Sequence, residues 1–193
     1  SAFAMAVSLV LYKNYFDPWE WKHEGWSFFS IMQPENFGRD LYLYLFSSGH
    51  YLKVHQWLGS LILWLGAKDQ AVLISSIFLI IGGMLTFLTF FRFAYALTRE
   101  LSASALATIF FALEVVAFPM GNGHLMVVSP RYIAVLPLIF LSLRYYFENS
   151  RELFLVFLLL ASAIYGNPAI YVFGIFLLHD AWLVLARELS WKK

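Results

Sequence analysis

The sequence predicts an all-α protein: a polytopic transmembrane helix bundle of about six spans, with a long external first loop that carries an interfacial amphipathic helix. Two observations support this fold class. Of the 193 residues, 61% are hydrophobic and 13% are charged, whereas a soluble domain has about 45–50% apolar and about 25% charged residues. Several stretches are also apolar for about 20 residues, the length that a helix needs to cross the hydrocarbon core. The chain therefore has too little polar surface to cover a water-soluble body.

The first element is a partial span over residues 1–12. The run "AFAMAVSLVL" is apolar, and it lacks the basic start and the cleavage site of a signal peptide. We interpret it as the outer half of a first span, and residues 1–193 as a single transmembrane domain or the N-terminal portion of one. Residues 13–70 then form an external loop, whose stretch "YKNYFDPWEWKHEGW" has the mixture of aromatic and charged residues found at headgroup level.

An interfacial helix is predicted over residues 51–65 of this loop. Its polar stripe consists of Lys53, Gln56 and Ser60, at the spacing i, i+3 and i+7. Its apolar face consists of Val54, Trp57, Leu58, Leu61 and Leu65. Because tryptophan favours the headgroup level, we expect this helix to lie flat on the outer membrane surface.

Five further spans are predicted at 71–97, 102–120, 129–147, 150–166 and 168–187. Ser129 and Pro130 suit the N-cap and the first turn of the third of these spans. The apolar block 153–187 allows two interpretations, one tilted helix or two helices. The "GNP" turn signal ending at Pro168 favours two helices, with starts near Ser150 and Pro168.

The basic residues orient the predicted bundle. They fall in three groups, which are Arg92 with Arg99, Arg144 with Arg151, and Arg187 with Lys192 and Lys193. Cytoplasmic loops are enriched in Lys and Arg, and the turns "GNGH" and "GNP" between these groups contain no basic residue. The alternation places both termini in the cytoplasm and residues 13–70 outside.

Two stretches carry a resemblance to a known family. They are "HYLKVHQWLGSLILWLGAKDQAVLISSIFLIIGGMLTFLTFFRFAYALTRE" and "SPRYIAVLPLIFLSLRYYFENSRELFLVFLLLASAIYGNPAIYVF". The first resembles the juxtamembrane helix and second span of the GT-C superfamily of integral-membrane glycosyltransferases, and the second resembles a later helix pair of bacterial members. Asn167 stands where many relatives have His before Pro168. The resemblance implies the front part of a longer, polyprenyl-phosphate-sugar-dependent enzyme in the bacterial inner (plasma) membrane.

The function implied by this resemblance is transfer of a sugar from a lipid-phosphate donor to an acceptor at the external membrane face. Such a reaction needs a carboxylate that deprotonates the acceptor hydroxyl. The candidates in the outer loop are Asp17, Glu24 and Asp40. Asp17 lies at the family's usual distance after the first span, and Glu24 matches an acid–Gly–aromatic pattern of some relatives. The alternative for each acid is a solvated loop carboxylate.

The candidate substrate-binding residues are Arg131, His124, His55 and Glu114. Arg131 falls in the first turn of a predicted helix, where free N–H groups and the helix dipole favour an anion such as the donor phosphate. Its alternatives are contact with lipid headgroups or pairing with Glu114. Glu114 lies within a span and should face the bundle interior.

The sequence predicts no metal site within the spans. His179 and Asp180 are adjacent, but consecutive helical residues point about 100° apart, so they form no site by themselves. Outer-loop carboxylates could hold a divalent cation together with a donor phosphate. Expected partners are membrane lipid, the lipid-linked sugar donor and other membrane subunits; the net charge of +1 argues against nucleic acid.

The alternative function is that of a non-catalytic integral membrane subunit of a larger membrane complex. A transporter is disfavoured, because no pair of helices shows matching polar interruptions at the midplane.

Overall fold

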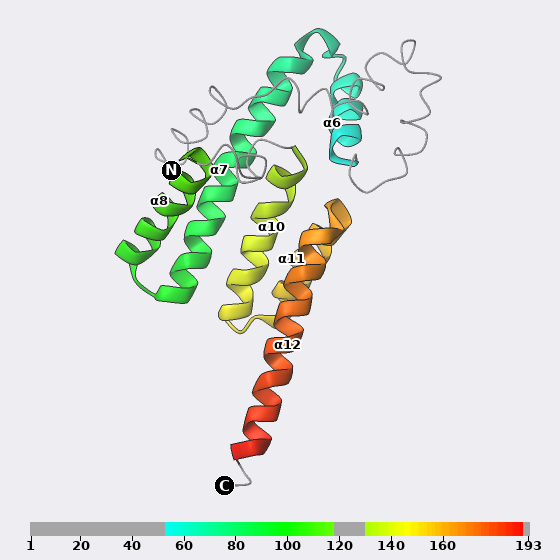
Figure 1. The fold of residues 1–193 in the computed structure, drawn as a ribbon. Coiled ribbons are helices and arrows are strands. Elements are labelled where there is room, and N and C mark those ends of the chain that lie inside the picture. Colours follow the sequence, from blue (N-terminus) through cyan, green and yellow to red (C-terminus); the bar gives the residue numbers. More distant parts are fainter. Residues whose placement is uncertain (1–52, 118–129, 191–193) are drawn as a thin grey trace.

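The computed structural model describes residues 53–117 and 130–190. These residues form helices and short turns, with no strand among them (Figure 1). The helices are α6 (Lys53–Trp64), the 3-10 helix η2 (Lys68–Gln70), α7 (Ala71–Thr98), α8 (Leu101–Ala117), α10 (Pro130–Phe147), α11 (Arg151–Ile164) and α12 (Gly166–Ser190). The all-helical prediction is therefore confirmed for the described part of the chain.

The turns between helices use residues that adopt the left-handed conformation. Gly66 has φ +65° and lies just past the end of α6, a conformation that costs glycine little. Its N–H donates to the Leu63 carbonyl at 2.9 Å. Arg99 has φ 57° and ends α7, with its N–H on the Tyr95 carbonyl. Asn149, at φ 60°, turns the chain between α10 and α11. Each reversal brings successive helices side by side.

The last apolar block forms two helices, as the "GNP" signal favours. They are separated at Tyr165, whose backbone is extended. Helix α12 starts two residues before Pro168, so this proline occupies the first turn, where its missing N–H costs no hydrogen bond.

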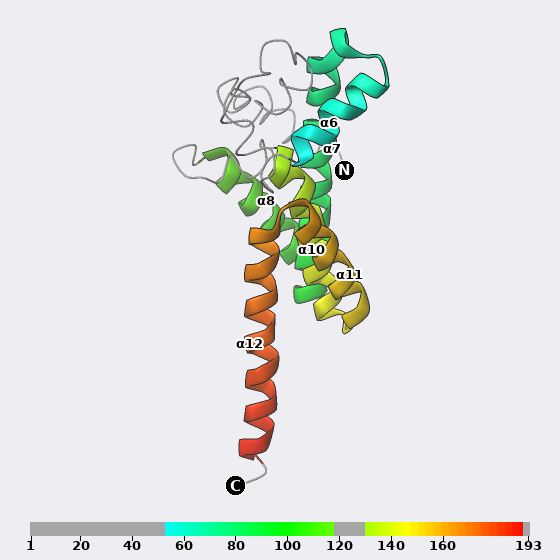
Figure 2. The same cartoon turned by 90° about the vertical axis from the view of Figure 1, so that its right-hand side faces the viewer.

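The helices differ in how far they extend along the bundle. Figures 1 and 2 show α7, α8, α10 and α11 side by side, with α6 against the end of the bundle where α7 begins. Helix α12 begins level with the middle of α7 and continues well beyond the end at which α7 and α10 stop. Of the apolar stretch in α12, 6% is buried, against 44% for that in α7. Helix α7 is thus central and α12 peripheral.

Small and hydroxylated residues line the contact between α7 and α8. Ser104, Thr108 and Ala112 are buried on α8 at a spacing of four residues. Ser104 Oγ donates to the Glu100 carbonyl at 2.6 Å and lies 2.9 Å from Thr98 Oγ1. Small residues let helix backbones approach closely, and they are enriched between membrane helices. Aromatic rings also pack in this contact: Phe111 stacks on Phe90, with centroids 4.4 Å apart, and lies edge-on to Phe87 at 5.7 Å.

Helix α6 packs against the first turns of α7 and the start of α10. Leu58 and Ile62 join Leu79 of α7 and Ile133 of α10 in one buried cluster. Trp57 and Trp64 are exposed. The structure thus divides the predicted apolar face of α6: Leu58 packs on the bundle, and Trp57 lies outside it. The division arises because α10, distant in sequence, lies beside α6.

Two helices in the described part are long and apolar enough to cross a membrane, Leu73–Thr98 within α7 and Asn167–Ala186 within α12. The apolar segments Leu101–Leu113 and Tyr132–Phe147 are shorter. Helix α11 has 14 residues, about 21 Å at 1.5 Å per residue, which is less than the hydrocarbon thickness of about 30 Å. A total of about six spans remains a prediction.

Candidate functional site

A group of four polar side chains joins α10, α11 and α12 near the end of the α10–α11 hairpin. We call Tyr146, Arg151, His179 and Asp180 the polar cluster. The Tyr146 hydroxyl donates to Asp180 Oδ1 at 2.5 Å and lies 2.6 Å from His179 Nδ1. Arg151 Nη2 donates to the same Asp180 oxygen at 3.1 Å. One carboxylate oxygen therefore receives hydrogen bonds from two other helices.

The contact with Tyr146 depends on which ring nitrogen of His179 carries a hydrogen. A tyrosine hydroxyl has a single proton, which the Tyr146–Asp180 hydrogen bond uses. With that proton donated to Asp180, the contact at 2.6 Å between Tyr146 and His179 Nδ1 is a hydrogen bond in the tautomer that carries its hydrogen on Nδ1. Nδ1 also lies 3.7 Å from Asp180 Oδ1, so the imidazole ring belongs to the same polar group.

Aromatic packing holds the tyrosine in place. Tyr146 is buried, and its ring lies 3.9 Å from that of Phe176 and 5.3 Å from that of Phe154, centroid to centroid. The Arg151 guanidinium carbon lies 4.0 Å from the centroid of the Tyr146 ring, within the range of a cation–π contact. Arg151 and Asp180 keep 47% and 43% of their side-chain surface exposed, so their ion pair lies at the edge of the bundle.

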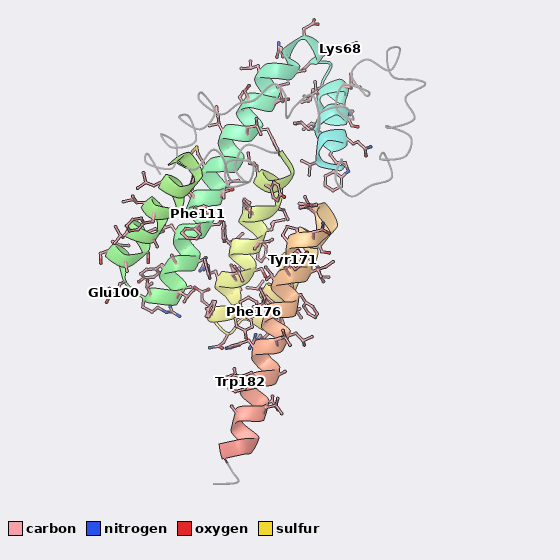
Figure 3. The ribbon with its side chains drawn as sticks, viewed as in Figure 1. Lys68, Glu100, Phe111, Tyr171, Phe176 and Trp182 are labelled. Atoms are coloured by element: carbon pink, nitrogen blue, oxygen red, sulfur yellow. The ribbon has the colours of Figure 1, made fainter. Side chains whose placement is uncertain are left out.

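The local sequence explains why Tyr146 and Arg151 lie close together, but not why Asp180 joins them. Tyr146 lies in the last turn of α10 and Arg151 is the first residue of α11, so the three-residue turn with Asn149 brings them together. Helix α12 runs back along α11, with Phe176 packed near Phe154, and this carries Asp180 to the other two. Figure 3 shows Phe176 at the level of the hairpin and Trp182 beyond it.

The sequence identified His179 and Asp180 as adjacent residues that form no site by themselves. The structure places the Tyr146 hydroxyl against both of them. Sequence reasoning missed Tyr146 and Arg151. The only local signal was the aromatic and basic composition of "RYYFENSR", which carries no information about α12.

The predicted catalytic acids Asp17, Glu24 and Asp40, and the predicted binding residue His124, lie outside the described residues. Three other predicted binding residues belong to described helices: His55 to the first turn of α6, Glu114 to the last turn of α8, and Arg131 to the first turn of α10. The cluster of Leu58, Ile62 and Ile133 makes α6 and the start of α10 neighbours. Contact between the predicted side chains stays a prediction.

Within residues 53–117 and 130–190, no group of three or more His, Asp or Glu side chains could hold a metal ion. The outer-loop carboxylates considered for a divalent cation lie outside these ranges.

Comparisons of the chain with protein-family models, with curated protein sequences and with solved structures each found no match.

Proposed function

We propose that the protein is an integral membrane bundle of about six spans in the bacterial plasma membrane, with both termini cytoplasmic and residues 13–70 external. The apolar composition supports this proposal, together with the two helices that are long enough to cross a bilayer. The exposed side chains of Trp57, Leu61 and Trp64 support an interfacial position for α6. They recur at i, i+4 and i+7, so they share one side of the helix, and tryptophan favours the headgroup level.

Within this topology, we propose that the chain is the N-terminal part of a glycosyltransferase that uses a lipid-phosphate-linked sugar at the external face. The observation that carries the proposal is the packing of Ile133 against Leu58 and Ile62. It supports a shared membrane side for α6 and for the first turn of α10, which contains Arg131. A helix start with an arginine favours a phosphate.

In the proposed reaction, the acceptor oxygen forms a bond to the anomeric carbon of the sugar while the bond from that carbon to the phosphate oxygen breaks. Asp17, Glu24 or Asp40 takes the proton of the acceptor hydroxyl. Arg131 stabilises the negative charge left on the lipid phosphate. The carboxylates that do not act as the base are candidates for holding a divalent cation, in which case EDTA would lower transfer.

The test is sugar transfer from polyprenyl-phosphate-mannose or polyprenyl-phosphate-glucose to a lipid-exposed acceptor in membranes that contain the protein. We expect one of Asp17→Asn, Glu24→Gln and Asp40→Asn to lower turnover by about 10²–10⁴-fold, the usual contribution of a general base. Asp69→Asn, in the exposed 3-10 helix η2, is the matched control. Unchanged turnover in all three variants would remove the catalytic proposal.

Arg131 is tested by binding rather than by turnover. Arg131→Gln should weaken the binding of polyprenyl phosphate to the detergent-solubilised protein, measured by native mass spectrometry. Arg92→Gln is the control, because Arg92 is an exposed arginine towards the other end of α7. Equal loss in both variants would indicate general charge attraction and not a phosphate site at α10.

A second candidate function is that of a non-catalytic membrane subunit, and the exposure of α12 favours it. Ile170 and Leu177 are exposed apolar residues along this helix and would be available to a helix of a partner subunit. A photo-crosslinking residue at either position should then join the protein to another membrane protein. Adducts with lipid alone would contradict this candidate.

A further inference from the structure

We propose that the polar cluster is a latch that fixes the position of α12 on the α10–α11 hairpin, and that α12 swings away from the bundle when the latch is broken. The latch contacts are those of Tyr146 and Arg151 with Asp180. This inference concerns the position of one helix and is independent of the proposed glycosyl transfer.

Among the side chains of α12 whose burial the structure describes, apolar packing is confined to the first half of the helix. Ala169 is buried, and Val172 and Phe176 pack partly buried against the cluster formed with α10 and α11. From Ala181 to Leu185 every side chain is exposed. The polar cluster therefore lies where the packed part of α12 gives way to the exposed part.

Polar contacts matter more for this helix than for a helix in the core of a soluble protein. Lipid tails are as apolar as leucine side chains, so apolar side chains gain little by leaving lipid for a protein surface. Interhelical hydrogen bonds are one of the remaining sources of association. Asp180 receives two of them from the neighbouring helices, which makes it the residue on which docking of α12 depends.

The connection to α11 allows the proposed movement. Tyr165 has an extended backbone between the two helices, and a single connecting residue can act as a pivot. Helix α12 has 25 residues, about 37 Å at 1.5 Å per residue. A small rotation at Tyr165 would therefore move the far end of the helix by many ångströms.

The test uses pairs of spin labels, which can be attached at chosen sites because the chain contains no cysteine. Leu106→Cys on α8 and Leu185→Cys on α12 report the position of the far end of α12. Leu73→Cys on α7 and Leu106→Cys on α8 report a distance within the bundle that does not involve α12. These leucines are all exposed. Distances between the labels are measured by double electron–electron resonance in lipid nanodiscs.

We expect a single narrow distance for the 106–185 pair in the parent protein and a broad distribution in Asp180→Ala, which removes the acceptor of both hydrogen bonds. Tyr146→Phe keeps the ring and removes only the hydroxyl, so it should broaden the distribution less. The matched control is Tyr171→Phe on the exposed side of α12 (Figure 3), which should leave the distance unchanged. Asp180→Arg alone should broaden the distribution. The charge-swapped double variant, Asp180→Arg with Arg151→Asp, should restore a narrow distribution, because the two side chains can pair again.

Two results would overturn the latch. One is a 106–185 distance that stays narrow and unshifted in Asp180→Ala. The other is an equal broadening of the 73–106 pair, since the polar cluster would then support the whole bundle and not the position of α12.

Discussion

Replacing Gly82 with alanine introduces a methyl group where α7 packs tightly against Ile133 of α10. A Cβ at this position would lie 1.7 Å from Ile133 Cγ2 and 3.2 Å from Ile133 Cβ. Carbon atoms in contact are normally about 3.5–4.0 Å apart, so the two methyl groups must separate by about 2 Å. Ile133 is 1% exposed, and a β-branched side chain in a helix has one strongly preferred rotamer. The helices must therefore move apart.

The expected cost is about 1–3 kcal/mol of unfolding free energy, the usual range for overpacking. Alanine also raises helix propensity by up to about 1 kcal/mol relative to glycine, which would mask part of the collision. Gly174→Ala measures this gain in helix propensity alone, because a Cβ at Gly174 meets nothing within 4 Å. Subtracting the change in unfolding free energy in Gly174→Ala from that in Gly82→Ala therefore gives the cost of the collision with Ile133.

The assay is unfolding in mixed micelles with a rising fraction of sodium dodecyl sulfate, followed by circular dichroism. Ile133→Ala removes the methyl group that collides, so the double variant with Gly82→Ala should be less destabilised than the sum of the two single variants. Additive effects, or equal stability of Gly82→Ala and Gly174→Ala, would refute the close packing of α7 on α10.

Three further predictions test other parts of the bundle. Within the described part of the chain, the buried Ser75 hydroxyl has no hydrogen-bond partner. Ser75→Ala should therefore leave the unfolding free energy unchanged or raise it. Ser104→Ala should lower the unfolding free energy by about 1 kcal/mol, because the Ser104 hydroxyl donates a hydrogen bond to the Glu100 carbonyl at 2.6 Å. In the same assay, Gly66→Ala should cost about 1–2 kcal/mol, since φ is +65° there and the strain is in the backbone alone. For sidedness, Lys68→Cys should react with an impermeant maleimide in intact cells, and Glu100→Cys, at the opposite end of α7 (Figure 3), only after permeabilisation. The reverse labelling pattern would contradict the proposed orientation.

The helices were predictable because their determinants are local. As helices, the segments predicted at 71–97 and 129–147 correspond to α7 (Ala71–Thr98) and α10 (Pro130–Phe147), and the membrane crossing by α10 stays a prediction. The start of α10 coincides with a proline, which favours the first turn. The "GNP" signal predicted a break with a new helix starting near Pro168; the break is at Tyr165, one residue before this signal, and "GNP" itself forms the first residues of α12. Each of these features depends on a few neighbouring residues, so it can be found without knowledge of the fold.

The candidate sites were less predictable. The proposed acids Asp17, Glu24 and Asp40 stay predictions, because they lie outside the described residues. On α6, the periodicity identified an apolar face but could not tell that Leu58 packs on Ile133 while Trp57 stays exposed. That division depends on where α10 passes.

The sequence by itself determined that the chain is unusually apolar and that its described part is helical, since hydropathy, caps and turn residues act over a few positions along the chain. Only the tertiary structure decided that Tyr146 donates a hydrogen bond to Asp180, 34 residues away, and that Ile133 packs against Gly82. The physical reason is that such contacts depend on which helices lie side by side and at what level. A shift of one turn along α12 would move Asp180 by about 5.4 Å and break its hydrogen bonds, yet leave every local sequence signal unchanged.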